Sequence, residues 1–455
     1  MEQAEVVVVL TRRESQSPIS IGNPLAAGPG SGMDLDGLIF QPVFEPRSVA
    51  PGPLSAPGVP GPASTAMSRF YRLEVEREEA KSIARALRER PDVEAAFAKP
   101  RPLLPIAPYQ SLVTPTIPDT RPIPDFTSRQ GYRAAAPAGV DVAAAWAVAG
   151  GRGDSVSIVD IEGGWCLDHV DLEGNGGLRG GRDFREVGWR NHGTAVLGVM
   201  VGEDDAKGVR GIAPAARAMA YTHRTHGAAG SIQRAADLLS PGDVMLLEMH
   251  SPGPRFDYEE REDQAGYIAV EWWPDSLAAV RYAVSRGIVV VGAAGNGAED
   301  LDDHIYDEPG EGFPGDWSNP FRSTDSGAIL VGAGAPSGGT YGPARSRLDF
   351  SNFGSRVDCQ GWGRGVCTTG YGDLWSGQGE TEWFTDEFSG TSSATPVVAG
   401  VVACVQGIAR SRSRALSPDR MRRLLRENGS MQPGDSAAAG MIGPLPDLAA
   451  IIDAM

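Results

Sequence analysis

The stretch GTSSATPVVAG, residues 390–400, decides the fold of this chain, because small polar residues lead directly into the apolar run VVAGVVACV. Small polar residues that open a buried helix contribute little to a core, but they present a hydroxyl at the first turn. A serine hydroxyl is a weak nucleophile that needs a base within hydrogen-bond reach. The rest of the sequence must therefore supply that base and a scaffold that brings it to Ser392.

Size and composition exclude several classes of protein. The chain has 455 residues, of which 41% are hydrophobic and 22% are charged, as in ordinary globular proteins. A net charge of −17 argues against binding to nucleic acid or to an anionic membrane, because both require a basic face. No apolar run approaches the ~20 residues that span a bilayer. The start, MEQAEVVVVLTRRE, lacks the basic segment of a signal peptide, so we expect a cytoplasmic protein unless another route exports it.

The four cysteines are too few for a disulfide scaffold. Cys404 lies inside the apolar run and is expected to be a buried thiol. Cys359 and Cys367 bracket QGWGRGV, where they could close a small disulfide loop or remain thiols. The missing signal peptide favours thiols.

From about residue 140 the pattern alternates between strands and helices. The expected strands are near-continuous apolar runs, which is typical of strands buried on both faces: 155–160, 216–222, 243–250, 288–296 and 328–334. Helical stretches lie between them at 192–200, 232–239 and 274–287. This alternation predicts an α/β fold with a mostly parallel sheet flanked by helices.

The first 120 residues do not show this regular alternation of apolar strands and helices. Two strand-like runs, 70–75 and 93–100, flank an amphipathic helical pattern that Pro91 ends, and EVVVVL at 5–10 adds a further strand. Residues 48–66, rich in Pro, Gly and Ala, are expected to be a loop or linker. The proline-rich connector 100–126 is expected to be exposed, extended chain. We therefore predict a small α+β module over residues 1–120, followed by the main domain over residues 121–455.

Four polar residues from distant segments could meet at one edge of the predicted sheet. Asp160 ends the first strand, Asn296 ends the fourth, His192 lies on a helix, and Ser392 opens the apolar helix. In open α/β sheets, active sites gather at the carboxyl ends of the strands. A serine, a histidine base, an aspartate and an amide donor together form the set of groups that acyl transfer requires.

Three motifs resemble those of a known family. NHGTAVLGVMVG, VVVGAAGN and GTSSATPVVAG are similar to the His, oxyanion-Asn and Ser motifs of the subtilases, the subtilisin-like serine peptidases. The order Asp, His, Ser matches, and GIAP at 211–214 and FSNFGSRVD at 350–358 add further likeness, so the resemblance covers residues 138–455. It implies a serine endopeptidase acting on polypeptides, with Ser392 as nucleophile, His192 as base, Asp160 orienting His192, and Asn296 as oxyanion donor.

The aspartate motif departs from the family pattern. In VDIEGGWCLDHVDL, Ile161 and Glu162 stand where subtilases have small residues, so a charged Glu162 close to His192 is expected to raise its pKa. Asp168 and Asp171 are alternatives to Asp160, but neither ends a strand.

The segment DVMLLEMHSPGP aligns with the strand that lines the substrate cleft of subtilases. Glu248, Met249 and His250 stand where a small Ser-Leu-Gly segment is common. We expect these three residues to bind substrate and to narrow or charge the cleft, because substrate pairs with such a strand as added β-structure.

The N-terminal module resembles the inhibitor prodomain of subtilases. This resemblance implies that the module is the chain's own intramolecular inhibitor and that self-cleavage occurs within the connector. Two alternatives stay open. The chain could be an inactive subtilase that binds a peptide partner, or a narrow protease that matures one precursor.

Metal binding has weaker support in the sequence. His223 and His226 have a ligand-like spacing but no third ligand, and the acidic stretch 298–316 is expected to be a solvated loop. The resemblance allows a structural Ca²⁺ near Asp205, and the chemistry of a serine nucleophile requires no cofactor.

Overall fold

The computed structural model describes residues 3–11, 19–20, 37–45, 67–105, 119–174, 177–322, 325–434 and 440–455. The proline-rich stretch 48–66 and residues 106–118 of the connector lie outside the described residues. The described part of the connector therefore ends at Pro105 and resumes at Asp119.

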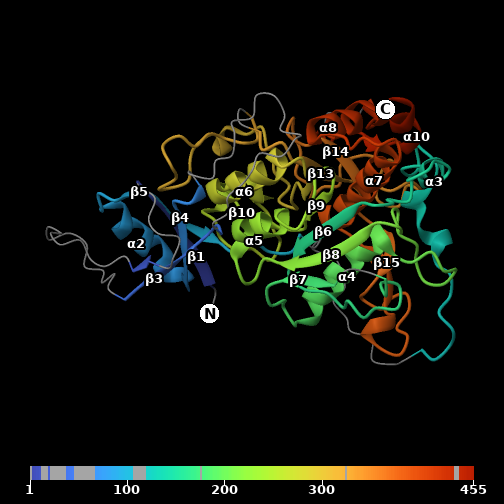
Figure 1. The fold of residues 1–455 in the computed structure, drawn as a ribbon, viewed down its shortest axis with the longest axis horizontal. Helices are drawn as coiled ribbons and strands as arrows, with labels where there is room; N and C mark the ends of the chain where they lie inside the picture. The colour runs from blue at the N-terminus through green and yellow to red at the C-terminus, as the bar shows by residue number, and fades with distance from the viewer. Residues whose placement is uncertain are drawn as a thin grey trace.

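A parallel sheet of seven strands forms the centre of the molecule (Figure 1), as the sequence pattern predicts. In spatial order its strands are β14 (Cys359–Trp362), β13 (Ile329–Gly334), β12 (Val289–Ala293), β9 (Val244–Leu247), β6 (Ser157–Glu162), β8 (Arg217–Thr222) and β7 (Leu178–Gly180). Strand β6 lies between β9 and β8, and both pairings are parallel. Its carboxyl end therefore lies near the middle of one sheet edge, where ligand sites of such folds are found.

Helices cover both faces of this sheet. On one face lie α4 (Val187–Val201) and α7 (Thr391–Ser411), and on the other lie α5 (Gly227–Ala236) and α6 (Pro274–Ser285). Successive side chains of a strand point to opposite faces, and β6 follows this rule. Ile158 packs in the core under α4 and α7, whereas Val159 and Ile161 pack in the core under α5 and α6.

Helix α7 is the longest helix of the described residues, with 21 residues. By length and composition it could cross a membrane, but its most apolar window is entirely buried inside the protein. Gly390 precedes it with φ of 101°, a left-handed conformation that favours glycine. The tight turn at Gly390 lets the chain enter the helix with Ser392 in its first turn.

The remaining elements are short. Three two-stranded sheets pair β10 (His250–Pro252) with β11 (Tyr267–Ala269), β15 (Val366–Thr369) with β16 (Phe384–Phe388), and β17 (Gly429–Ser430) with β18 (Leu445–Pro446). The short helices are α3 (Val142–Trp146), α8 (Pro418–Glu427) and α10 (Leu448–Asp453). The predicted cap of α8 is present, because the Ser417 side chain accepts a hydrogen bond from the Arg420 amide.

The N-terminal residues form a separate small sheet, drawn in blue at the left of Figure 1. Its order is β2 (Ile19–Ser20), β3 (Ile39–Pro42), β4 (Phe70–Glu76), β1 (Gln3–Leu10) and β5 (Val93–Pro100). Alternate valines of β1 pack into two different hydrophobic cores. Val6 and Val8 pack against α2 (Arg77–Arg88), whereas Val7 and Val9 pack in the core under α5 and α6.

Polar contacts also join the small sheet to the main domain. The Lys99 ammonium donates to both carboxylate oxygens of Asp275, at 2.9 and 2.8 Å, and to the Ser276 hydroxyl at 2.9 Å. All three side chains are buried at the start of α6. By contrast, the ion pair between Lys81 and Asp257, at 2.7 Å, is exposed.

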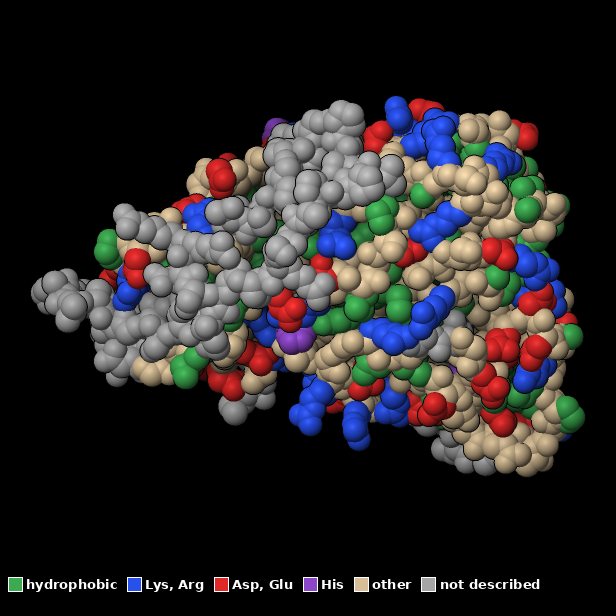
Figure 2. All heavy atoms as spheres, in the orientation of Figure 1, with side chains coloured by type: hydrophobic (Ala, Val, Ile, Leu, Met, Phe, Trp, Pro, Cys, Tyr) green, Lys and Arg blue, Asp and Glu red, His purple; other side chains and the backbone are tan. Residues whose placement is uncertain are grey.

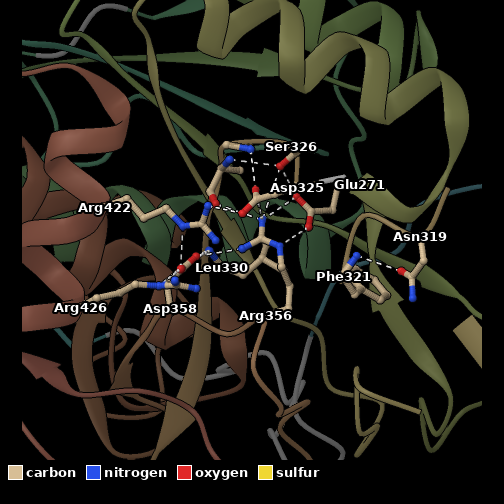
Figure 3. A network of polar contacts seen from close by, with 12 residues as sticks. Glu271, Asn319, Phe321, Asp325, Ser326, Leu330, Arg356, Asp358, Arg422 and Arg426 are labelled. Carbon is tan, nitrogen blue, oxygen red and sulfur yellow. Dashed lines mark hydrogen bonds and ion pairs between the residues drawn. The ribbon is translucent and has the colours of Figure 1, made fainter. Parts of the chain in front are cut away.

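A second buried ionic group lies at the amino ends of β13 and β14 (Figure 3). Arg356 Nε donates to Glu271 at 2.8 Å, and its Nη1 donates to Asp358 at 2.9 Å. Arg422, on α8, donates from Nε to Asp358 at 2.7 Å, and Arg426 contacts the same carboxylate. This network ties α8 to the segments that flank β13 and β14.

The structure differs from the sequence expectations in the number and the length of its strands. Strands β7 and β14 were not expected, because each is too short to give an apolar run. Strand β6 ends at Glu162 rather than at Asp160.

The four cysteines are free thiols, as the sequence favours. On the face in Figure 2, acidic and basic side chains are interspersed rather than gathered by sign.

Candidate active site

The proposed nucleophile and base lie on the two helices that cover one face of the sheet. Ser392 is in the first turn of α7, and His192 is in α4. Both side chains are fully buried. Glycine in the His motif allows α4 to pack closely on strand β15, since a Cβ on Gly198 would lie 2.3 Å from the Thr369 hydroxyl oxygen.

Residues 103–105 of the connector run along the cleft beside these helices. The Leu103 amide donates to the His250 carbonyl at 2.9 Å, and the His250 amide donates to the Leu103 carbonyl at 3.2 Å. The two residues therefore form an antiparallel bridge, which is how a peptide adds to a sheet edge. Gln264 Nε2 donates to the Leu104 carbonyl at 3.1 Å.

The next residue of this segment meets the serine directly. The Ser392 hydroxyl donates a hydrogen bond of 2.9 Å to the carbonyl oxygen of Pro105. The segment Leu103–Leu104–Pro105 thus lies in the cleft as an extended peptide whose last described carbonyl group faces the candidate nucleophile.

Asn296 lies beside Ser392 through the neighbouring residue. Its Oδ1 accepts from the Thr391 amide and from the Thr391 hydroxyl, both at 2.9 Å. Its Nδ2 donates to Oε1 of Gln264 at 3.3 Å, and Gln264 in turn binds the connector segment 103–105, called the tail below. Because the first amides of a helix have no partner within the helix, the Ser392 amide is a second donor at this position. Two donors near a reacting carbonyl can stabilise an oxyanion.

The carboxylate that contacts the histidine is not the one that the family motif favours. Nδ1 of His192 lies 3.0 Å from Oε2 of Glu162, and both side chains are fully buried. Asp160 Oδ2 instead accepts a hydrogen bond of 2.7 Å from Trp165 Nε1. The sequence prediction gave this position to Asp160, where the apolar run ends. The strand continues for two more residues, and the period-2 alternation brings Glu162 to the same face as Asp160.

Burial dominates the electrostatics of this group. It lowers the pKa of His192 to about 3, so the rise that the sequence led us to expect from Glu162 is wrong. Burial also raises the pKa values of Asp160 and Glu162 well above their ordinary range. The ring of Phe388 packs edge-on to His192 with centroids 5.6 Å apart. His192 Nε2 has no hydrogen-bond partner among the described residues. It is therefore free to accept a proton in the neutral imidazole form.

The three predicted substrate-binding residues have three different surroundings. The backbone of His250 binds the tail as described above, and its Nδ1 accepts from the Asn296 amide at 3.3 Å. Glu248 is fully buried beside Ser392, whose hydroxyl lowers the pKa of the Glu248 carboxyl against the larger rise from burial. Met249 packs in the hydrophobic core under α5 and α6. Of the three, His250 is the one that contacts the peptide segment by a hydrogen bond.

The predicted Ca²⁺ position does not fit a cation well. Asp205 forms an ion pair with Lys207 at 3.2 Å, and this lysine competes for the carboxylate. In the acidic stretch, Glu299 and Asp303 both pair with Arg255. No three His, Cys, Asp or Glu side chains lie close enough to hold a metal ion within the described ranges.

Comparison with known proteins identifies relatives for most of the main domain. The chain is 28% identical to the intracellular serine protease of Paenibacillus polymyxa over 284 residues, which is 60% of this chain and 72% of the relative. It is 27% identical to subtilisin Savinase of Lederbergia lenta, over 56% of this chain and 77% of the relative. It spans only 54% of the M-protease of Shouchella clausii, at 28% identity.

Solved structures agree on the fold. Fervidolysin from Fervidobacterium pennivorans matches 85% of this chain and 56% of its own, with a TM-score of 0.52 and 19% identity. A protease from Pseudoalteromonas arctica matches 73% of this chain and 99% of its own, with a TM-score of 0.51 and 21% identity. At these identities the likeness concerns the fold alone.

The model of the subtilase family matches residues 167–441. The matched span includes the segments of His192, Asn296 and Ser392, and it begins after β6, the strand on which this chain departs from the family motif. It covers more than half of the chain. Together with the parallel sheet and the site at its edge, this match establishes that the chain belongs to the subtilase family of serine peptidases.

Proposed function

We propose that this protein is a serine endopeptidase that first cleaves its own connector. The observation that carries the proposal is the 2.9 Å hydrogen bond between the Ser392 hydroxyl and the Pro105 carbonyl oxygen. The antiparallel bridge between Leu103 and His250 supports it, because it holds the segment in the extended form in which a protease binds substrate.

The geometry supports a mechanism of acyl transfer. Ser392 Oγ attacks the Pro105 carbonyl carbon while His192 Nε2 accepts the hydroxyl proton. The Ser392 amide and Asn296 Nδ2 donate to the oxygen that becomes negative, which stabilises the tetrahedral intermediate. His192 then protonates the nitrogen of Ile106 as the peptide bond breaks, and water hydrolyses the acyl group from Ser392 by the reverse sequence of proton transfers.

The N-terminal sheet acts as the intramolecular inhibitor in this proposal. Its last strand, β5, leads directly into the tail that fills the cleft. The buried contact of Lys99 with Asp275 and Ser276 fastens the sheet to the start of α6. Cleavage after Pro105 would divide the chain into an inhibitor of residues 1–105 and a peptidase domain, close to the boundary at 120 that the sequence suggested.

The substrates of the released enzyme are polypeptides in extended form. The buried carboxyl of Glu248 and the imidazole of His250 occupy positions where small residues are common, so we favour a protease of narrow specificity over a general degrader. An intracellular site of action is part of this proposal, and the relative named an intracellular serine protease supports it. Comparing a peptide library with casein as substrates tests the specificity, and cell fractionation tests the location.

Intact mass measurement of the purified protein tests the self-cleavage. The wild type should yield a fragment that ends at Pro105, whereas Ser392→Ala should remain full length. Ser393→Ala is the matched control, because it removes the neighbouring hydroxyl, which is bonded to the Trp362 carbonyl, and should still be cleaved. A wild type that stays full length while it digests peptides would refute the inhibitor role.

Labelling with a fluorophosphonate probe separates this proposal from an inactive subtilase that only binds peptides. The probe should react with Ser392 in the processed wild type and not in Ser392→Ala. Absence of labelling in processed, folded protein would favour the binding function.

A further inference from the structure

The end of β6 carries two buried carboxyl groups on one face, and only one of them reaches the histidine. Asp160 and Glu162 are two residues apart, so the strand places them on the same side and about 6.6 Å apart along its axis. Glu162 is the last residue of the strand and lies nearer the sheet edge. Its longer side chain brings Oε2 to 3.0 Å from His192 Nδ1.

Asp160 is held by a different partner. Trp165 Nε1 donates to its Oδ2 at 2.7 Å, and its Oδ1 has no hydrogen-bond partner among the residues described. Trp165 lies in the turn that follows β6, and its ring packs in the core with α4 and α7. This contact holds the Asp160 carboxyl at the turn, and among the described residues Asp160 forms no hydrogen bond with the imidazole.

The pKa values of Asp160 and Glu162 are shifted by different surroundings. Burial raises the pKa of Asp160, and the nearby Glu162 carboxylate raises it further, against the opposing hydrogen bond from Trp165. Burial likewise raises the pKa of Glu162, but the Gly163 amide opposes this rise. Two like charges so close together in a buried site are unfavourable, so one group keeps its proton. These effects make Glu162 the more readily ionised of the two carboxyl groups.

We propose that Glu162, rather than Asp160, is the carboxylate that orients His192 and stabilises its imidazolium during catalysis. Glu162 is thus a positioning residue that acts through His192, and Asp160 supports the turn at Trp165. The proposal rests on the serine endopeptidase function proposed above. Because a carboxylate can only accept a hydrogen bond, Glu162 fixes the tautomer with the proton on Nδ1 and leaves Nε2 to accept the Ser392 proton.

The rate of connector cleavage within the intact chain provides the first test. Glu162→Gln keeps the volume but offers an amide that can hold the wrong tautomer, and we expect the rate to fall by about 10³–10⁴-fold. Asp160→Asn should lower it by less than about tenfold, because an amide oxygen still accepts from Trp165. Glu162→Asp keeps the carboxylate on a shorter side chain and should lie between the two. A larger loss in Asp160→Asn than in Glu162→Gln, or equal losses, would overturn the proposal.

A spectroscopic test does not depend on turnover. In the uncleaved Ser392→Ala protein, the Nδ1 proton of His192 should give a downfield proton resonance coupled to its ring nitrogen. This resonance should shift or vanish when Glu162→Gln is added and persist when Asp160→Asn is added. A resonance that responds only to Asp160→Asn would contradict the assignment. The failure of the serine function itself would look different, since Ser392→Ala would then still be cleaved.

Discussion

Two buried groups of carboxyl side chains in this molecule are built in opposite ways. In the group of Figure 3, Glu271 and Asp358 both bind Arg356, and Arg422 and Arg426 contact Asp358 as well. At the active site, the members are Asp160, Glu162 and Glu248. None of these three forms an ion pair with Lys or Arg in the described part of the chain, and the ionisable partner at hydrogen-bond distance is His192.

The difference teaches how burial acts on a charge with and without a counter-ion. Burial opposes the charge of Arg356, yet the carboxylates of Glu271 and Asp358 more than offset it and raise its pKa. For Glu248, burial raises the pKa, and the neighbouring Asp160 and Glu162 raise it further. The first group therefore holds the fold together in a charged form. The second destabilises the fold in its charged form, which is typical of groups retained at a site for function.

Removing the central cation should have the largest effect on stability. Arg356→Met leaves two buried carboxylates without their main partner, and we expect the free energy of unfolding to fall by about 3–5 kcal/mol. Urea denaturation in the Ser392→Ala background measures this without self-digestion. Arg426→Met is the matched control, because the Arg426 side chain is 42% exposed, and it should cost at most about 1 kcal/mol. Similar losses in both variants would show that burial does not govern the network.

Removing a neutral hydrogen-bond donor at the active site should slow connector cleavage rather than lower the stability of the fold. Asn296→Ala removes Nδ2 from the oxyanion position, and connector cleavage should slow by about 10²–10³-fold. Time courses of the intact chain by mass spectrometry measure this. Asn428→Ala removes an amide that binds the Leu424 carbonyl at the end of α8, and it should leave the cleavage rate nearly unchanged. An equal rate in Asn296→Ala and wild type would refute the oxyanion role.

Removing an uncompensated acid should increase stability. Glu248→Met replaces a buried carboxyl that has no Lys or Arg partner among the described residues, and in the Ser392→Ala background we expect a gain of about 1–3 kcal/mol in the free energy of unfolding. The pKa of Glu248 is raised on folding, so the native state binds more protons than the unfolded state above the ordinary value of 4.5. Wild-type stability therefore falls as the pH rises through this window, by up to about 1.4 kcal/mol per pH unit.

The gain from Glu248→Met should accordingly grow as the pH rises from about 4.5. Denaturation curves at several pH values, again in the Ser392→Ala background, measure the slope. Asp358→Asn is the contrasting variant, because it removes a carboxylate that is compensated by arginines and should destabilise the protein. A gain for Glu248→Met that shrinks with rising pH would contradict the sign argued here.

The sequence was sufficient to predict the layers of the main domain. Apolar runs mark strands that are buried on both faces, and their alternation with helices dictates a parallel sheet. The sequence also predicts that His192, Asn296 and Ser392 gather at one edge of the sheet. In the structure Asn296 follows β12, Ser392 lies in the first turn of α7, and His192 lies in the second turn of α4. The family match covers all three of these segments.

The acidic member of the site could not be predicted in the same way. The apolar run of β6 stops at Asp160, so the sequence pattern ends the strand there. In the folded chain, pairing with β8 continues through Ile161 and Glu162. Strand length is set by the neighbouring strands rather than by local preference. Likewise, nothing in the sequence indicates that Trp165 binds Asp160, since that contact depends on a turn whose shape no pattern encodes.

The smallest effect on the free energy of unfolding is expected at an ion pair that is exposed to solvent. Lys81 binds Asp257 at 2.7 Å between α2 and the main domain, and both side chains are more than half exposed. Because water already solvates these charges, Lys81→Ala should change the free energy of unfolding by at most about 1 kcal/mol. Lys99→Ala, across the same interface, leaves the buried Asp275 unpaired and should cost about 3–5 kcal/mol. Equal losses of stability for Lys81→Ala and Lys99→Ala in urea denaturation would show that burial does not decide how much an ion pair contributes in this protein.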